Sequence, residues 1–231
     1  MTTPGATWHV IVVDETGSTN ADLLDSAVAG ASDRTVLRAR HQTAGRGRLG
    51  RQWSAPADTN LLVSLLFREV PPNPHELTQR VALAAVAASR EIAAVTATLK
   101  WPNDLLVEGR KLAGILAQAG ATSASDTPEY VVVGLGLNVA WAPDGAARLG
   151  EQFDPADVLD ALLAAYDRLP SDIAEMYHAG LETIGKSVRV ELATSTVVGH
   201  ALDVLADGRL VVLDECGITH RFDTGDVVHL R

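Results

Sequence analysis

Residues 45–56 read Gly-Arg-Gly-Arg-Leu-Gly-Arg-Gln-Trp-Ser-Ala-Pro, and this stretch decides between two fold classes. Its glycines match the G-x-G-x-x-G pattern of dinucleotide-binding sites, which requires a strand before it and a helix after it. Residues 36–41 alternate as a strand does, but residues 52–58 contain Pro56 and have no apolar stripe at helical spacing. A doubly wound parallel sheet is therefore disfavoured, and the stretch is predicted to be a cationic loop.

Three arginines give this loop its chemistry. Arg46, Arg48 and Arg51 each carry a permanent planar cation that binds phosphate or carboxylate through paired donors. The glycines beside them let the backbone approach a ligand closely, and Trp53 can stack on a flat ring. A solvated basic turn is the plainest alternative. A nucleic-acid-binding Arg/Gly module is another, but 19 Lys+Arg against 29 Asp+Glu give a formal charge of −10, which opposes a polyanion outside this loop.

Two further stretches carry candidate site residues. Residues 100–104 read Lys-Trp-Pro-Asn-Asp, and the next residues predict a β-hairpin with strands at 105–107 and 112–118 around a Glu-Gly-Arg turn. Lys111 starts the second strand: it is either a surface lysine or, if it points inward, a cation that requires an anionic partner. Residues 131–139 form an apolar strand with two glycines, which indicates either close approach of a ligand or relief of crowding in a buried core.

The order of these motifs resembles that of the biotin protein ligase family. The motifs are G-R-G-R-x-G-R-x-W from residue 45, K-W-P-N-D from residue 100, K-x-x-G-I-L from residue 111, G-x-G-x-N-V from residue 134, and an earlier Ser-Thr-Asn at 18–20. The similarity covers about residues 10–139 and continues more weakly after residue 185. Each motif alone is modest, but five in this order are highly specific. Leu49 departs from relatives that carry another arginine there, so we expect altered ligand retention rather than loss of chemistry.

The resemblance implies an α+β fold. A mixed, largely antiparallel sheet would be backed by helices, as in class II aminoacyl-tRNA synthetases and biotin ligases, and followed by a small C-terminal SH3-like β-barrel. Residues 1–184 would form the catalytic biotin- and ATP-binding domain, and residues 185–231 the C-terminal domain. The residue patterns predict strands at 8–13, 36–41 and 60–67, helices at 20–28 (capped by Ser18 or Thr19), 75–94, 154–169 and 171–183, a Ser/Thr/Ala-rich loop at 120–128, and short strands at 187–192, 196–205, 210–213, 220–222 and 227–230.

Composition indicates a folded cytoplasmic protein. Hydrophobic residues make up 47% of the chain and charged residues 21%. No apolar run approaches the length of a transmembrane helix, and the first residues lack the pattern of a signal peptide. Cys216 is the single cysteine, so no internal disulfide can form. The histidines are scattered, and no structural transition-metal site is expected.

The resemblance implies an ATP-dependent biotin protein ligase. Biotin and MgATP would give biotinyl-5′-AMP, with Mg²⁺ carried by the pyrophosphate, and the biotinyl group would pass to a lysine of a biotin carboxyl carrier domain. The catalytic residues would be Lys111, Arg46, Arg48 and Asp104. The expected biotin-binding residues are Ser18, Thr19, Asn20, Gln42, Gly45, Arg46, Gly47, Arg48, Lys111, Gly114 and Gly136. Those expected to bind ATP or the adenylate are Arg46, Arg48, Arg51, Trp53, Asn103, Lys111 and Asn138.

Individual roles follow from the same resemblance. The Ser-Thr-Asn motif and Gln42 would hydrogen-bond the ureido head of biotin, Gly114 and Gly136 would leave space for its bicycle, and Trp53 would cover the adenine. Asp104 would orient or deprotonate the acceptor lysine, or instead fix Lys100 or bind Mg²⁺.

Two alternatives and two expected absences complete these expectations. A lipoate-type protein ligase or acyltransferase would use a similar lysine, but lipoate has no ureido group to match the polar motif. The Arg/Gly nucleic-acid-binding module would not require Lys111 or ATP. The Ser-Thr-Asn motif comes too early for a preceding DNA-binding domain, so no operator binding is expected, and no membrane partner either. The enzyme is expected to be a monomer or a weak homodimer.

Overall fold

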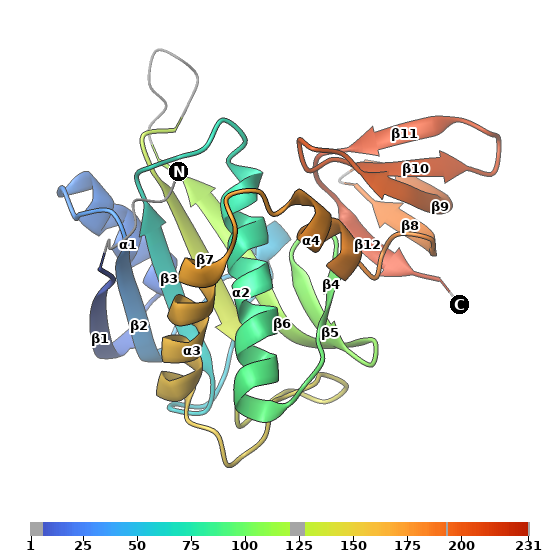
Figure 1. The fold of residues 1–231 in the computed structure, drawn as a ribbon. Helices are drawn as coiled ribbons and strands as arrows, with labels where there is room; N and C mark the ends of the chain where they lie inside the picture. Colours follow the sequence, from blue (N-terminus) through green and yellow to red (C-terminus); the bar gives the residue numbers. More distant parts are fainter. Residues whose placement is uncertain (1–6, 121–127, 193, 231) are drawn as a thin grey trace.

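A mixed sheet of seven strands organises the larger part of the chain (Figure 1). The computed structural model describes residues 7–120, 128–192 and 194–230. The strands are β1 (His9–Thr16), β2 (Thr35–Gln42), β3 (Leu61–Phe67), β4 (Thr98–Lys100), β5 (Asp104–Val107), β6 (Arg110–Ala119) and β7 (Val131–Leu137). They lie in the order β1-β2-β3-β7-β6-β5-β4, with β1 and β2 parallel and the other neighbours antiparallel. This arrangement confirms the predicted mixed, largely antiparallel sheet.

Helices cover both faces of this sheet. They are α1 (Thr19–Val28), α2 (His75–Ala93), α3 (Pro155–Arg168) and the shorter α4 (Ala174–Gly180), with one 3₁₀ turn, η1 (Arg48–Gly50). In Figure 1, α2 and α3 lie side by side over one face, where Leu65 of β3 belongs to their core. The next residue, Leu66, points to the other face and packs with α1. Because the sheet is covered on both sides, β3 is apolar almost throughout rather than alternating.

One predicted helix start agrees with the structure, and one predicted helix end does not. Asp154 caps α3, since its carboxylate accepts from Ala156 N at 2.7 Å, and Pro155 takes the first helical position. The helix predicted over residues 171–183 is limited to α4. Its last predicted turn instead runs beside β4, where Glu182 N donates to Leu99 O at 2.8 Å. Pairing with β4, a three-residue strand that was not predicted, overrides the helical pattern there.

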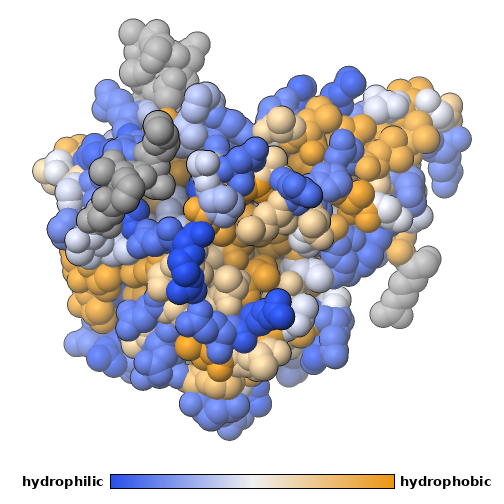
Figure 2. Space-filling model, in the orientation of Figure 1, coloured by the Kyte–Doolittle hydropathy of each residue, from blue (hydrophilic) through white to orange (hydrophobic). Residues whose placement is uncertain are grey.

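A second, antiparallel sheet follows. Its strands are β8 (Ser187–Glu191), β9 (Thr196–Val204), β10 (Leu210–Asp214), β11 (Thr219–Phe222) and β12 (Asp226–His229), in the order β11-β10-β9-β8-β12. These are the predicted short strands, and the sheet agrees with an SH3-like fold. It lies against one end of the first sheet, where Trp101 Nε1 donates to Gly208 O at 2.8 Å (Figure 1). Figure 2 shows apolar residues on the surface of this part of the molecule. Leu202 of β9 and Ile218, in the turn before β11, are among its exposed large hydrophobic residues.

The predicted loop at residues 120–128 is described only in part. Residues 121–127, the middle of the predicted Ser/Thr/Ala-rich loop, lie outside the described residues. Within the described part of the chain, no helix combines the length and the apolar character needed to cross a membrane.

Candidate active site

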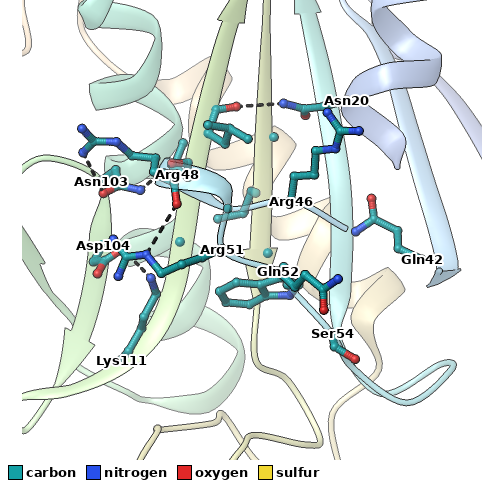
Figure 3. A pocket seen from close by; sticks show the side chains of 18 of the residues that line it. Asn20, Gln42, Arg46, Arg48, Arg51, Gln52, Ser54, Asn103, Asp104 and Lys111 are labelled. Atoms are coloured by element: carbon teal, nitrogen blue, oxygen red, sulfur yellow. Dashed lines mark hydrogen bonds and ion pairs between the residues drawn. The ribbon is translucent and has the colours of Figure 1, made fainter. Parts of the chain in front are cut away.

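A cavity of about 270 Å³ opens on the face of the large sheet that carries α1. Figure 3 shows side chains from several separate segments pointing into it. All of the predicted site residues except Gly45 line this cavity. They are Ser18, Thr19, Asn20, Gln42, Arg46, Gly47, Arg48, Arg51, Trp53, Asn103, Asp104, Lys111, Gly114, Gly136 and Asn138.

One end of the cavity is a hydrogen-bonded polar network. Gln42, at the end of β2, accepts through Oε1 from Thr19 N at 2.7 Å and lies 3.1 Å from Thr19 Oγ1. Asn20 Nδ2 donates to Gln118 Oε1 at 2.8 Å. Ser18 occupies the N-cap position of α1, but its side chain makes no capping hydrogen bond. The predicted hydroxyl cap is therefore wrong, because Gln42 satisfies an N–H of the first turn instead.

Two further residues support this network: sequence reasoning missed Ser64 and gave Gly134 no individual role. Ser64 is fully buried in β3, donates to Asn20 Oδ1 at 2.6 Å and lies 2.7 Å from Thr19 Oγ1. Gly134 of β7 faces the same amide, since a Cβ there would lie 2.2 Å from Asn20 Oδ1. A lone serine in an otherwise apolar strand was the available signal for Ser64, because a buried hydroxyl requires a partner.

The arginine loop, residues 45–53, is closed by its own backbone. Gly47 N donates to Arg51 O at 2.7 Å. At its tip Leu49 and Gly50 have φ values of +55° and +74°, in the left-handed region that favours glycine. No helix follows this loop before α2, which confirms that its glycines are not a dinucleotide-binding fingerprint.

Two arginines join this loop to other parts of the molecule. Arg48 Nη1 donates to Asn103 Oδ1 at 3.3 Å, and Nη2 donates to Thr224 Oγ1 at 2.8 Å. Arg51 Nη2 lies 3.1 Å from Asp226 Oδ2. Burial lowers the pKa of Arg48, and neighbouring carboxylates oppose that shift. The guanidinium stays charged in any case, so the cavity keeps a cationic wall.

Lys111 points toward the cavity and has an anionic partner. Its Nζ donates to Asp104 Oδ1 at 2.7 Å (Figure 3). The hairpin of β5 and β6 brings these two residues together, with Glu108 and Gly109 both at positive φ in its turn. Lys111 is therefore a partly exposed lysine that faces the cavity, and the Asp104 carboxylate pairs with Lys111 rather than with Lys100.

The Trp53 indole lies against β6 and β7. A Cβ at Gly136 would be 2.4 Å from Trp53 Cε2, and one at Gly114 would be 3.2 Å from Cζ3, so glycine permits the approach. Its buried Nε1 has no hydrogen-bond partner among the described residues. In this structure the indole occupies the space above these two glycines, and their expected contact with a biotin bicycle stays a prediction. Gly45, just outside the cavity wall, accepts from Trp53 N at 3.0 Å and fixes this end of the loop.

Asn138 supports the backbone at the end of β7. Its Nδ2 donates to Ala147 O at 2.9 Å, and its Oδ1 accepts from Asn60 Nδ2 at 3.2 Å. Asn60, which sequence reasoning missed, also accepts from Val139 N at 3.1 Å. These buried amides hold in place the strand end on which the cavity wall depends.

The cavity therefore joins a neutral hydrogen-bonding end to a cationic end. Thr19 and Gln42 at one end suit a urea- or amide-like group, whereas Arg48 and Lys111 at the other suit carboxylate and phosphate. Among the described residues, no group of three or more His, Cys, Asp or Glu side chains forms a metal site. The arrangement can bring two anionic groups together beside a polar head group.

Comparisons with known proteins agree with this chemistry. Residues 12–138 match the Biotin/lipoate A/B protein ligase family, and residues 183–230 match the Biotin protein ligase C terminal domain. The biotin–[acetyl-CoA-carboxylase] ligase of Mycobacterium tuberculosis is 41% identical over 98% of this chain and 91% of its own length. The bifunctional ligase/repressor BirA of Bacillus subtilis is 31% identical over 91% of this chain and 71% of its own length.

Solved structures share the fold. A biotin protein ligase from Aquifex aeolicus in complex with biotin and ATP has a TM-score of 0.78 at 24% identity, over 96% of this chain and 99% of that chain. A Helicobacter pylori biotin acetyl coenzyme A carboxylase synthetase with bound biotinylated ATP has a TM-score of 0.69 at 18% identity, over 94% of this chain and 100% of that chain. The chain belongs to the Biotin/lipoate A/B protein ligase family, and its C-terminal match and curated relatives place it among the biotin protein ligases.

Proposed function

We propose that this enzyme joins biotin to ATP, giving biotinyl-5′-AMP and pyrophosphate, and then transfers the biotinyl group to a lysine of a biotin carboxyl carrier domain. One observation carries the proposal: a single cavity has a neutral polar end at Thr19 and Gln42 and a cationic end at Arg48 and Lys111. The name of the Mycobacterium tuberculosis relative, a biotin–[acetyl-CoA-carboxylase] ligase, supports a carboxylase carrier domain as the acceptor.

The first step joins two anions. A carboxylate oxygen of biotin attacks the α-phosphorus of ATP, and the bond to pyrophosphate breaks. Lys111 would lie between the carboxylate and the α-phosphate, while Arg46 and Arg48 stabilise charge on the phosphoryl oxygens. The two carboxylates of the described cavity wall, Asp104 and Asp226, are both held by cations. We therefore infer that the triphosphate itself supplies the main ligands of Mg²⁺.

The second step uses the carboxylate of Asp104 after Lys111 has moved away from it. The acceptor amine attacks the acyl carbon of the mixed anhydride, AMP leaves with the bonding electron pair, and the amine loses a proton. When Lys111 turns toward the phosphate, Asp104 loses its cation and becomes available to orient the acceptor amine or take that proton. Arg51 would help close the loop over the adenylate, which excludes water from the anhydride.

The polar end favours biotin over lipoate. A ureido group has one acceptor oxygen and two N–H donors, and the side chains of Ser18, Thr19, Asn20 and Gln42 offer both donors and acceptors. Because buried polar groups left unpaired are costly, such a site rejects an acid without the ureido group. Gly114 and Gly136 would contact the bicycle once the Trp53 indole turns away to cover the adenine, with Asn103 and Asn138 beside the nucleotide.

Further properties stay predictions. We propose that the catalytic domain ends near residue 185, that the enzyme works in the cytoplasm as a monomer or weak homodimer, and that it binds no operator DNA. The net charge of −10 supports the last point. Fluorescence anisotropy with candidate operator DNA checks it, and salt-sensitive, sequence-specific binding would contradict it.

A transfer assay tests the proposed function. The protein is incubated with MgATP, a purified carrier domain and either biotin or lipoate, and the intact mass of the carrier is measured. We expect one biotinyl group per carrier and no lipoyl group. Lys111→Ala should slow adenylate formation by about 100-fold or more, as loss of a preorganised catalytic cation does. Lipoylation without biotinylation would favour the lipoate-type alternative, and near-normal adenylation by Lys111→Ala would remove this lysine from the reaction.

A further inference from the structure

The arginine loop is held by the C-terminal sheet as well as by its own backbone. Arg48 Nη2 donates to Thr224 Oγ1 at 2.8 Å, and Arg51 Nη2 lies 3.1 Å from Asp226 Oδ2. Two of the three loop arginines therefore contact the segment around the start of β12: Thr224 lies in the turn before this strand, and Asp226 is its first residue. Asp226 also lines the cavity itself.

The loop requires such support. It contains three glycines, and Leu49 and Gly50 at its tip have positive φ, so ordering it costs conformational entropy. Its arginines also repel one another: burial is the main cause of the lowered pKa of Arg48, and the charge of Arg51 lowers it further. A carboxylate and a hydroxyl at fixed positions offset both effects.

Of the two supporting residues, Asp226 lies on a strand, whereas Thr224 lies in the turn between β11 and β12. Asp226 opens β12 and pairs with Glu191 of β8, and the next residue, Val227, is buried in the core. The carboxylate is thus carried by a strand of a packed sheet rather than by a free loop.

We propose that Thr224 and Asp226 are positioning residues, which hold Arg48 and Arg51 in an ordered loop so that ATP meets a preformed cationic wall. The C-terminal sheet then contributes to nucleotide binding without contacting the reacting atoms. The ATP readout rests on the proposed function, whereas the order of the loop can be measured without nucleotide.

The test compares Asp226→Asn and Thr224→Val with the wild type. Amide hydrogen exchange over residues 45–53, measured without nucleotide, should become faster in both variants. The KM for ATP in the adenylation step should rise by roughly three- to tenfold, the range for one half-exposed ion pair or hydrogen bond, with kcat changed less than about twofold. High salt should reduce the difference in the KM for ATP between Asp226→Asn and the wild type, because salt screens the ion pair. Asp226→Glu should restore the low KM for ATP.

Asp203→Asn is the matched control. Asp203 of β9 lies 2.8 Å from His178 Nε2 of α4, so it also joins the C-terminal sheet to the rest of the protein, but away from the arginine loop. This variant should change neither loop exchange nor the KM for ATP.

Three results would overturn the inference. Hydrogen exchange of residues 45–53 could be unchanged in Asp226→Asn, Asp203→Asn could change this exchange and the KM for ATP as much as Asp226→Asn does, or Asp226→Asn could have a lower KM for ATP than the wild type. The last would mean that the carboxylate competes with phosphate for Arg51. If the wild type forms no adenylate, the proposed function fails, and hydrogen exchange alone decides the inference.

Discussion

At the scale of single residues, the pair of Lys111 and Asp104 links the two steps of the proposed reaction. The ammonium and the carboxylate lie 2.7 Å apart, and an incoming carboxylate and phosphate compete for the same cation. Asp104→Asn removes the carboxylate charge while keeping the shape of the side chain. We expect it to leave adenylate formation within a few-fold of wild type and to slow transfer to the carrier by roughly 100-fold, within the range for loss of a general base.

Separate single-turnover assays of the two steps check this prediction. The first follows biotinyl-5′-AMP by mass spectrometry, and the second follows its consumption by the carrier domain. An equal decrease in the rates of adenylate formation and transfer would mean that Asp104 serves mainly to position Lys111.

Ser64 gives a second prediction at this scale. Its buried hydroxyl lies between Thr19 and Asn20, so Ser64→Ala leaves both polar groups short of a partner. Biotin should bind more weakly by about 1–2 kcal/mol, which is roughly five- to thirtyfold in Kd. Ser89→Ala is the control, because Ser89 is equally buried but donates to Ala85 O within α2. Equal biotin affinity in the two variants, measured by calorimetry, would remove Ser64 from the site.

At the scale of elements, the backbone of β7 lies close to Asn20, a side chain that lines the cavity. A Cβ at Gly134 would lie 2.2 Å from Asn20 Oδ1, so Gly134→Ala forces the amide away from Gln118. We expect at least a tenfold loss of biotin affinity and a cost of about 1–3 kcal/mol in the free energy of unfolding. Gly17→Ala is the control, since a Cβ there meets nothing within 4 Å. Wild-type affinity in Gly134→Ala would show that β7 can shift to accommodate the methyl group.

The same scale shows what sequence patterns can and cannot predict. The hairpin of β5 and β6 and the long helix α2 were predictable, because turn residues and apolar spacing act locally. The predicted site residues also converge, since motifs fix residue types at fixed spacing. The contact of Trp53 with Gly114 and Gly136 was not predicted, because it depends on the folded path of the arginine loop. Ser64 and Asn60 were missed, as their partners lie far away in sequence.

At the scale of the whole molecule, His229 makes stability depend on pH at the junction of the two sheets. Its Nε2 lies 3.1 Å from Thr183 Oγ1, and burial, followed by repulsion from Lys186 and Lys100, lowers its pKa to about 4. The unfolded chain takes up this proton near pH 6.5, but the folded protein takes it up only near pH 4. The free energy of unfolding should therefore fall as the pH decreases from 6.5 to 4, by about 1–3 kcal/mol from this group.

Denaturant unfolding of wild type and His229→Gln across this range measures that contribution. The difference between the two free energies of unfolding should shrink as the pH falls from 6.5 toward 4. His200→Gln controls for the loss of an exposed imidazole from the same sheet. A difference that stays constant with pH would contradict the assignment to His229.

The central claim is that one cavity binds biotin and then activates it with ATP. The most direct measurement is a calorimetric titration of biotin, with and without MgATP, followed by mass spectrometry of the bound species. We expect biotin binding in both cases and bound biotinyl-5′-AMP only after MgATP is added. Absence of biotin binding under both conditions, or ATP left intact with biotin bound, would contradict it.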